Sequence, residues 1–507
     1  MSHDAHETMP LWQDGKTFPE LDPLREAVQT EICIIGAGIA GLTTAYLLAR
    51  AGRQVLVLDR GGVGCGETGR STAHIASAVD DHYAELSNLL GAEAARLVAA
   101  SHGAAIDMIE RIQAEEGIDC AFQRLDGWLY PGEGGTEQEM RDEVKAARAA
   151  GLADAELRDH APVAGLGKGP AIRFPNQAQF DPYRYVLGLA EAVRRHGGRI
   201  HTGSPVHGVS DGDTVRVSVG KSLQVTAQAA VVATCTPIND RITLHSKQSP
   251  DRTYVIAAPV AAGSVPFGLY WDNDEPYHYV RLHRMEDGTE VLIVGGEDHR
   301  TGRPAEGEQR WKRLEDWARK RFPTMGEVRW RWSGHIIEPA DGIAFAGRNP
   351  GERNVYVATG DSGNGITHGT IAGMIISDLI QGRDNPWAAL YDPSRVTMKA
   401  AAEYASDNLQ VAEHYARWLG GGDVESTTDI APGQGAIIAH GLSHLAVYRD
   451  ELGHLHKRSA VCSHMKCLVR WNDAEKSWDC PCHGSRFDRY GNVVNGPATR
   501  SLASPED

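Results

Sequence analysis

The fold of the first part of the chain is decided by the segment Glu31-Ile-Cys-Ile-Ile35-Gly36-Ala-Gly38-Ile-Ala-Gly41. The β-rich run before the glycines predicts a short strand. The glycines have the Gly-x-Gly-x-x-Gly spacing of a dinucleotide-binding turn, in which the first makes the tight turn and the second lets a pyrophosphate approach the backbone. The third allows close packing of helix on strand. The segment therefore predicts a dinucleotide site but does not distinguish one dinucleotide from another.

The residues that follow complete a βαβ unit. Leu42–Arg50 has helical composition, Gly52 is a helix stop, and Gln54–Leu58 predicts the next strand, which ends at Asp59. An acid at this distance from the glycines is where a ribose-binding carboxylate belongs. The pyrophosphate is expected at the helix N-terminus, where unpaired N–H groups and the helix dipole favour an anion.

Bulk properties limit the function classes. The chain has 507 residues, 41% of them hydrophobic and 23% charged, and a formal net charge of −16. This charge argues against a nucleic-acid surface and against binding to an anionic membrane. No apolar run is long enough for an integral membrane segment, and the polar start shows no secretory signal, so we expect a cytoplasmic protein.

The middle of the chain mixes helical and β-rich runs, which predicts an antiparallel sheet beside a doubly wound domain. Helices are expected at Leu89–Gln113 and Pro182–His196, and strands at Arg199–Val209, Thr214–Val219, Ala229–Thr234 and Asn354–Thr359. Tyr277–Leu282 and Glu290–Gly295 predict a hairpin. A second glycine turn, Gly360–Gly365, precedes a helical run at Thr370–Ile380, and Pro393–Leu419 predicts a long linking helix.

Cysteine and histidine cluster near the C-terminus in Cys462-Ser-His464-Met-Lys-Cys467 and Cys480-Pro-Cys482-His483-Gly-Ser485. A Cys-x-His pair and a Cys-x-x-His pair supply two thiolates and two imidazoles. This set suits a 2Fe–2S centre in which two histidines bind one iron, and a zinc ion accepts the same set. The other four cysteines, Cys33, Cys65, Cys120 and Cys235, are scattered and are expected as buried free thiols.

Most of residues 28–385 resembles the FAD-dependent amine and amino-acid oxidoreductases, such as D-amino-acid, glycine and γ-glutamylputrescine oxidases. The resemblance rests on Gly61–Ser77, Phe180-Asp-Pro182-Tyr, Ser204-Pro-Val206, Ala230–Cys235 and Gly360–Thr367. It implies FAD as the dinucleotide. The cofactor-binding residues that motif and resemblance predict together are Gly36, Ala37, Gly38, Gly41, Leu42, Asp59, Arg60, Arg70, Ser71, Thr72, Ala73, Val206, Gly360, Asp361, Gly363, Gly365, Ile366 and Thr367.

The C-terminal motifs resemble the two cluster loops of Rieske proteins, which favours iron over zinc. The resemblance implies the ligands Cys462, His464, Cys480 and His483 and a disulfide between Cys467 and Cys482, with two free thiols as the alternative in a reducing compartment. It also implies that Ser485 donates a hydrogen bond to cluster sulfur. Phe487 stands where high-potential members carry Tyr, so we expect a mid-range potential.

The expected architecture has three parts. An α/β, doubly wound FAD-binding domain with an antiparallel-sheet substrate domain covers 28–385, with FAD-binding parts at about 28–80, 170–245 and 335–385 and substrate parts at about 81–169 and 246–334. A helical linker is expected at 386–426. A C-terminal all-β Rieske domain is expected at 427–507.

This combination predicts a dehydrogenase. Flavin accepts a hydride from a C–H beside an amine nitrogen, and the cluster passes the electrons singly to an external acceptor, a protein or a quinone. Amino-acid-using relatives clamp the substrate carboxylate with an Arg, but no Arg lies between Gly334 and Pro339. This favours an amine or N-alkyl amino compound, unless Arg281 or Arg284 replaces the clamp. The catalytic candidates are His335, Tyr254 and Tyr279.

Three other functions stay open at this point. A Rieske oxygenase would need a mononuclear iron site with two histidines and a carboxylate, for which no spacing is convincing. An NAD(P)H-dependent flavoprotein reductase should show a second Gly-x-Gly-x-x-Gly unit, and Gly360–Gly365 lacks that spacing. A redox carrier or sensor would leave the flavin half as an inactive scaffold.

Overall fold

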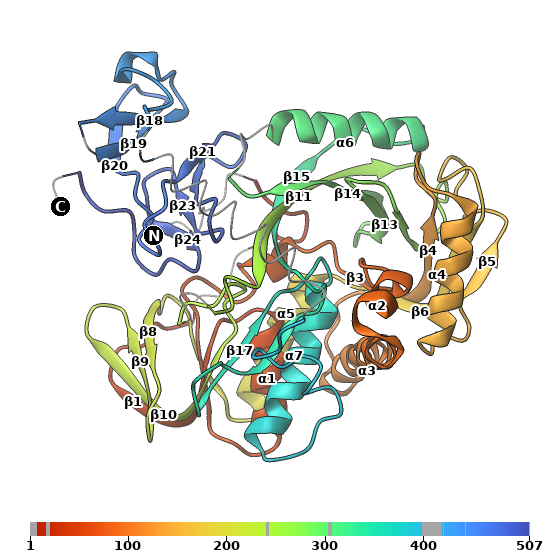
Figure 1. Ribbon diagram of the computed structural model, residues 1–507, viewed down its shortest axis with the longest axis horizontal. Coiled ribbons are helices and arrows are strands. Elements are labelled where there is room, and N and C mark those ends of the chain that lie inside the picture. The colour runs from red at the N-terminus through yellow and green to blue at the C-terminus, as the bar shows by residue number, and fades with distance from the viewer. Residues whose placement is uncertain are drawn as a thin grey trace.

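The computed structural model describes residues 8–16, 21–239, 243–302, 307–397, 418, 420–441 and 443–505. Two large sheets with flanking helices form the main body, and short strands near the C-terminus form a separate all-β domain (Figure 1). Within the described residues, no helix combines the length and the apolar character that crossing a membrane requires.

The first sheet contains the predicted βαβ unit, because β1 pairs in parallel with both β2 and β10. Its strand order is β16-β17-β10-β1-β2-β7, and the hairpin β8–β9 joins it along β10. The strands are β1 (Val28–Ile35), β2 (Val55–Leu58), β7 (Arg199–His201), β8 (Val206–Ser210), β9 (Val215–Val219), β10 (Leu223–Val232), β16 (Phe345–Arg348) and β17 (Val355–Thr359).

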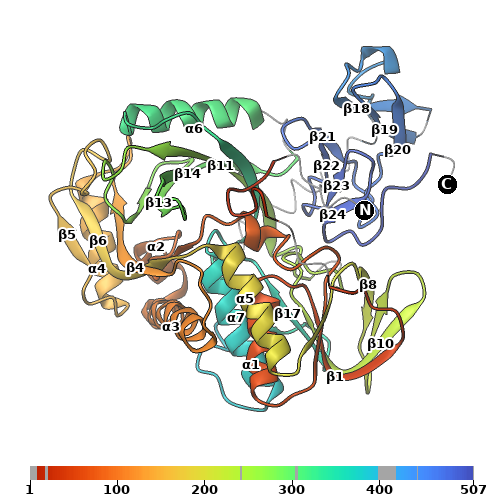
Figure 2. The same cartoon turned by 180° about the vertical axis from the view of Figure 1, so that it is seen from behind.

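Side chains of β1 alternate between two cores, which explains why both faces of this strand are apolar. Ile32 and Ile34 belong to the core under the helices, whereas Cys33 and Ile35 belong to the core shared with the hairpin β8–β9. The helices are α1 (Ile39–Arg50), α5 (Pro182–Arg195) and α7 (Gly365–Ile380). Figure 2 shows these three helices next to one another beside the sheet.

The second sheet is antiparallel except for the parallel pair β4–β12, and its order is β15-β11-β14-β13-β12-β4-β6-β3 with β5 on β6. Its strands are β3 (His74–Ile75), β4 (Gln123–Tyr130), β5 (Glu156–Arg158), β6 (Ala171–Gln179), β11 (Gln248–Val260), β12 (Leu269–Asp272), β13 (His278–Arg284), β14 (Glu290–Arg300) and β15 (Trp330–Pro339). The remaining helices are η1 (Glu67–Arg70), α2 (Tyr83–Leu90), α3 (Ala92–Glu116), α4 (Glu137–Ala149) and α6 (Gly307–Arg321).

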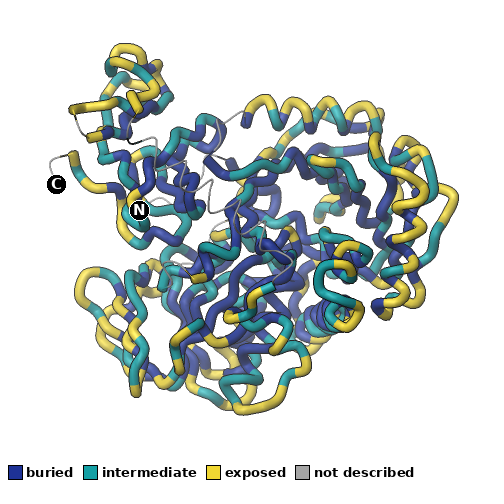
Figure 3. Tube along the Cα trace, in the orientation of Figure 1, coloured by how far each residue is buried: buried dark blue, intermediate teal, exposed yellow. Residues whose placement is uncertain are grey.

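The C-terminal domain is built from two small antiparallel sheets, β18-β19-β20 and β21-β22-β23-β24. Its elements are η4 (Thr427–Asp429), β18 (Gln434–His440), β19 (Ser443–Arg449), β20 (Leu455–Ser459), β21 (Arg470–Asn472), β22 (Ser477–Asp479), β23 (Arg486–Asp488) and β24 (Val493–Asn495). Tyr448, Trp478 and Phe487 form its core together with the cysteines of the two C-terminal loops. Figure 3 shows that buried residues continue from this domain into the main body.

The hairpin β13–β14 and the helices α5 and α7 confirm the sequence predictions. Three predictions were wrong in detail. Gly91 separates α2 from α3, so the helix expected at Leu89–Gln113 is two helices. The strand expected at Arg199–Val209 is broken before β8. Strand β6 pairs within the second sheet, although residues 170–245 are expected among the FAD-binding parts. Of the linking helix expected at Pro393–Leu419, residues 398–417 and 419 lie outside the described residues.

Candidate functional site

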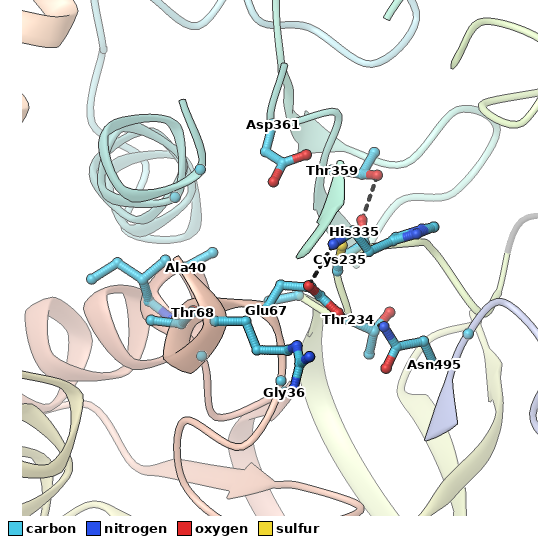
Figure 4. A pocket seen from close by; sticks show the side chains of 18 of the residues that line it. Gly36, Ala40, Glu67, Thr68, Thr234, Cys235, His335, Thr359, Asp361 and Asn495 are labelled. Carbon is cyan, nitrogen blue, oxygen red and sulfur yellow. Dashed lines mark hydrogen bonds between the residues drawn. The ribbon is translucent and has the colours of Figure 1, made fainter. Parts of the chain in front are cut away.

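One large cavity of about 1000 Å³ lies between the three parts of the molecule. Its walls come from the glycine turn after β1, from strands β11, β13 and β15 of the second sheet, and from residues 488–501 of the C-terminal domain. Figure 4 shows the cavity from close by. A space of this size accommodates a large organic cofactor together with a small substrate.

The end of the cavity beside α1 fits a dinucleotide. At Gly36, φ is +110° and a Cβ would lie 2.2 Å from the carbonyl oxygen of Ala233, so only glycine fits. The carboxylate of Asp59, at the end of β2, accepts hydrogen bonds from the N–H groups of Ala37 (2.7 Å) and Gly61 (2.8 Å). Burial raises the pKa of Asp59.

The N-terminus of α1 faces this end of the cavity. Gly38 occupies the N-cap and offers no side-chain hydrogen bond to the helix. The hydroxyl of Thr68 accepts a hydrogen bond from the N–H of Ile39 at 3.0 Å and lines the cavity beside Gly38 and Ala40. Helix N–H groups, a hydroxyl and an open glycine backbone form a cradle that suits a pyrophosphate.

The second glycine turn closes another side of the cavity. Gly360 and Gly363 have φ values of +74° and +68°, which favour glycine. Between them, the carboxylate of Asp361 accepts a hydrogen bond from the N–H of Ile337 in β15 at 2.9 Å. Burial raises the pKa of Asp361 to about 6. The turn is therefore tied to the second sheet at the point where both line the cavity.

The cavity wall formed by the second sheet and by the segment after β3 carries a carboxylate and two phenols. The hydroxyl of Tyr279 lies 2.8 Å from that of Thr253, and the hydroxyl of Tyr277 donates to Asp80 at 3.4 Å. Trp271 completes this wall. Desolvation by the surrounding protein raises the pKa of Asp80 to about 6. The wall therefore suits a cationic group better than an anionic one.

The two arginines considered as carboxylate clamps are engaged elsewhere. Arg281 is fully buried and donates to the carbonyl oxygens of Ala73 (2.8 Å) and Phe180 (3.1 Å), and Arg284 pairs with Glu290 at 2.8 Å. Neither belongs to the cavity wall. The described arginines that line the cavity are Arg60, Arg70 and Arg500.

Most residues predicted to bind the cofactor line the cavity. They are Gly36, Ala37, Gly38, Asp59, Arg60, Arg70, Ser71, Thr72, Val206, Gly360, Asp361, Gly363, Gly365 and Ile366. Four predicted residues do not line the cavity: Gly41, Leu42, Ala73 and Thr367. Each lies one or two positions after a lining residue on a helix or an extended segment, and at such neighbouring positions the side chain points into the core. At Gly41, for example, a Cβ would lie 2.0 Å from the carbonyl oxygen of Gly36.

Two of the three catalytic candidates, Tyr279 and His335, line the cavity. Tyr254 does not. Its hydroxyl lies 3.1 Å from Nε2 of His299, and its ring packs edge-on against Trp311 in the core beside α6. The alternation of β11 turns Tyr254 to the face of the sheet opposite Thr253, which lies in the cavity wall.

His335 joins the cavity to the C-terminal domain. The residue is 3% exposed, and a Cβ added to Gly484 would lie 2.5 Å from its Cε1, so the loop after His483 packs directly on the imidazole. Burial lowers the pKa of His335 to about 4. Its backbone N–H donates to Glu67 at 2.7 Å (Figure 4).

Two loops of the C-terminal domain bring the predicted metal ligands together. The N–H of Cys462 donates to the carbonyl oxygen of Cys467 at 2.9 Å, and the N–H of Cys480 donates to that of Ser485 at 2.8 Å. A hydrogen bond from the Cys480 thiol lowers the pKa of Cys462. The tight loops therefore place the two ligand sulfurs next to each other.

The two predicted histidine ligands also meet. The rings of His464 and His483 lie 5.1 Å apart, and His245 of the main body packs at 5.0 Å from each. Among the described residues, Nδ1 of His483 is buried without a hydrogen-bond partner, which leaves this atom available to a metal. Two adjacent sulfurs and two adjacent imidazoles fit the donor set of a 2Fe–2S cluster with two histidine ligands.

The surroundings of the loops follow the predictions. Cys467 and Cys482 form the expected disulfide. The hydroxyl of Ser485 accepts a hydrogen bond from the N–H of Ala498 at 3.0 Å and donates toward Cys462. Phe487 is fully buried in the domain core. The four scattered cysteines are free, as expected, but only Cys33 and Cys120 are buried; the expectation of burial was wrong for Cys65 and Cys235, which are half-buried.

A buried charge cluster links the C-terminal domain to the main body. Arg70 pairs with Glu475 at 3.2 Å, and Arg252 pairs with Asp479 at 3.7 Å. Within the C-terminal domain, Arg486 pairs with Asp479 at 3.1 Å. The side chains of all five residues are at most 4% exposed. The two halves are therefore joined by fully desolvated charges.

Sequence reasoning missed several residues of the site. Glu67, Asp80, Tyr277 and Asn495 line the cavity, and His245 lies between the predicted histidine ligands. Glu67 lies within the segment Gly61–Ser77 on which the resemblance rests, three residues before Arg70, so its place in the sequence could have indicated it. The others reach the site only through tertiary packing and carry no local pattern.

Comparison with known proteins identifies both halves. The model of the "FAD dependent oxidoreductase" family matches residues 31–379, and that of the "Rieske [2Fe-2S] domain" matches residues 422–506. The chain is 31% identical to YhfW of Bacillus subtilis (strain 168), a Rieske 2Fe-2S iron-sulfur protein by name, over 98% of this chain and 97% of the relative.

One further relative and one solved structure each match somewhat less than three quarters of the chain. Gamma-glutamylputrescine oxidoreductase of Escherichia coli (strain K12) is 25% identical over 72% of this chain and 87% of its own. The crystal structure of glycine oxidase from Geobacillus kaustophilus superposes with a TM-score of 0.60 and 18% identity, over 73% of this chain and 100% of that one, and so shares the fold.

Proposed function

Because the chain belongs to the FAD-dependent oxidoreductases and carries a Rieske [2Fe-2S] domain, we propose that it oxidises the C–N bond of an amine or N-alkyl amino compound and delivers the electrons to an external acceptor, a protein or a quinone. The observation that carries this proposal is the position of His335. This one residue lines the cofactor cavity and packs against Gly484, in the loop that holds His483.

The residues that would hold FAD are those of the glycine turns and their neighbours. The backbone from Gly36 to Gly38, with Thr68, would hold the pyrophosphate, and Asp59 would bind the ribose. The turn at Gly360–Gly365 would lie along the flavin. Cys462, His464, Cys480 and His483 would hold the cluster. Bound FAD supplies a two-electron hydride acceptor, and a bound cluster supplies a one-electron relay.

The substrate class follows from the wall of the second sheet. Asp80, with its pKa raised to about 6, is ionised at neutral pH and faces the cavity beside Tyr277 and Tyr279. Arg281 and Arg284, the alternative carboxylate clamps, are engaged outside the cavity. This part of the cavity would therefore bind an ammonium in preference to a carboxylate. The name of one relative, gamma-glutamylputrescine oxidoreductase, likewise contains the name of an amine.

The substrate chemistry needs little help from acid–base residues. The substrate loses a hydride from the carbon beside nitrogen and a proton from nitrogen, which gives an imine. Water hydrolyses the imine to a carbonyl compound and to ammonia, or to an amine when the substrate is N-alkylated. Asp80 would hold the protonated amine until it gives up its proton. Tyr279 and His335 would border the reacting carbon, and their packing excludes bulk water from that part of the cavity.

An anaerobic screen tests this proposal. Amines and N-methyl amines are added to the holoprotein, and the flavin absorbance and the EPR signal of the reduced cluster are followed together. Bleaching by an amine, followed by the EPR signal, is the expected result. Bleaching by NAD(P)H alone would instead indicate a reductase, no response to either would indicate a carrier, and zinc in place of iron would exclude the relay.

A further inference from the structure

The C-terminal domain supplies part of the cavity onto which the dinucleotide motif opens. Strand β24 and residues 499–501 line this cavity although they lie far beyond residue 379, where the match to the FAD-dependent oxidoreductase family ends. We propose that Arg500 binds FAD and that Asn495 is a positioning residue for the FAD site, so that the Rieske domain forms one wall of that site.

Hydrogen bonds fix the position of this wall. The N–H of Ser204 donates to the carbonyl oxygen of Asp59 at 2.7 Å, which places the chain before β8 beside the ribose-binding acid. Nδ1–H of His207, in β8, donates to the carbonyl oxygen of Thr499 at 2.7 Å, and the Thr499 hydroxyl donates back to the His207 carbonyl at 3.4 Å. Residues 499–501 therefore lie beside the part of the cavity that would hold the ribose and the adjoining phosphates.

Asn495 restrains the carboxylate of Glu67, which lies next to the pyrophosphate cradle. Its amide donates to one oxygen of Glu67 at 2.5 Å, and the N–H of His335 donates to the other at 2.7 Å. Figure 4 shows Asn495 facing Glu67 and Thr234 from the strand of the C-terminal domain. Because Glu67 precedes Thr68, an unrestrained carboxylate here would repel the phosphates. Asn495 holds that carboxylate in place.

Arg500 provides the charge that the phosphates need. Of the other arginines in the wall, Arg70 is paired with Glu475, and Arg60 is adjacent to Asp59. The Arg500 side chain is exposed and makes no hydrogen bond or ion pair with any residue in the described ranges, while its carbonyl oxygen accepts a hydrogen bond from Ser463 at 2.5 Å. An arginine whose backbone is held by a hydrogen bond and whose guanidinium is exposed can make a charge-assisted hydrogen bond to phosphate.

The test measures FAD affinity instead of turnover. Full-length protein stripped of flavin but retaining its cluster is titrated with FAD, and Kd is obtained from the quenching of flavin fluorescence. Arg500→Gln and Asn495→Ala are each expected to weaken binding about tenfold, the effect of losing one hydrogen bond to a charged group. The matched control is Lys457→Gln, which removes an exposed charge from β20, outside the cavity wall.

A second measurement uses the unaltered chain, in case a variant does not retain its cluster. FAD is expected to protect Arg500 from modification by phenylglyoxal, as read by mass spectrometry, and to leave the surface residue Arg383 unprotected. Wild-type affinity in both variants, equal weakening in Lys457→Gln, or modification of Arg500 at the same rate with and without FAD would each overturn the proposal.

Discussion

Glu475→Gln is the substitution that most directly probes how the two halves are joined. In the C-terminal domain, the carboxylate of Glu475 accepts hydrogen bonds from Arg70 (3.2 Å) and Thr8 (2.8 Å) and from the hydroxyl of Ser333, all outside that domain. Glutamine can keep the hydrogen bonds to the first oxygen, since the second has no partner within hydrogen-bond distance among the described residues. The substitution therefore removes the charge with little change of shape.

The expected magnitude follows from the charges that remain. Three guanidinium groups, of Arg70, Arg252 and Arg486, face the carboxylates of Glu475 and Asp479, and all five side chains are at most 4% exposed. Leaving a buried charge without its partner costs about 3–5 kcal/mol. We expect the lower end, about 3 kcal/mol, because glutamine still accepts hydrogen bonds from Arg70.

The assay follows the two cofactor sites separately during unfolding. Visible circular dichroism reports the cluster domain and flavin fluorescence reports the main body, because a chain of this size does not unfold as one two-state unit. In Glu475→Gln, the cluster transition should move to lower denaturant concentration. The control, Asp473→Asn, breaks the half-exposed pair with Lys476 and should change stability by no more than about 1 kcal/mol. Equal effects of the two substitutions would refute the reasoning.

The charge cluster also predicts a pH dependence. Burial opposes ionisation of Asp479, but Arg486 and Arg252 outweigh it and lower its pKa to about 2. A carboxyl group whose folded pKa lies below its unfolded value of about 3.9 stabilises the fold above that value. We expect this contribution to be fully present at neutral pH and to be lost as the pH falls from about 4 towards 2. Undocking that begins at pH 6 would contradict this assignment.

Three further substitutions test single sites. Cys467→Ser removes a disulfide that spans 15 residues and should destabilise the C-terminal domain by about 3 kcal/mol, measured as a shift of its denaturation midpoint; an unchanged midpoint would mean that the bond does not form. Asp80→Asn should raise KM for a protonated amine about tenfold at pH 8 and much less at pH 5, where Asp80, with a pKa of about 6, is already protonated; an equal effect at both pH values would count against an ion pair. Cys480→Ser should abolish the cluster EPR signal and keep the flavin spectrum, whereas Cys120→Ser, in the main body, should keep both.

The elements that sequence predicted well are those whose signal is local. Glycine spacing between Gly36 and Gly41 requires a particular backbone, and the structure shows the close approach that excludes a side chain. The pairing of Cys467 with Cys482 and the proximity of Cys462 to Cys480 were expected from the resemblance of two short motifs to Rieske cluster loops. In each case, the residues that come into contact belong to one short motif or to two neighbouring motifs, so their contact could be predicted from sequence.

The predictions that failed depend on partners distant in sequence. No local pattern in β6 indicates which sheet it joins, and its pairing with β3, β4 and β5 places it in the second. The sequence does not show that Tyr279 faces the cavity and Tyr254 the core, because the face to which a strand residue points depends on the register of the sheet. His245 and Asn495 reach the site only when the C-terminal domain docks.

The buried charges between the halves give orientation more than stability. Apolar residues of the same volume would hold two domains together at least as strongly, because desolvation offsets most of the attraction between buried ions. Charged partners, however, match in one arrangement only: Arg70 must meet Glu475 while Arg252 meets Asp479. That same arrangement seats Gly484 on His335 and brings Asn495 to Glu67. An electron relay needs a fixed, short separation between donor and acceptor. A FAD site shared between two domains needs a fixed position of one domain on the other. One docking geometry therefore meets both requirements.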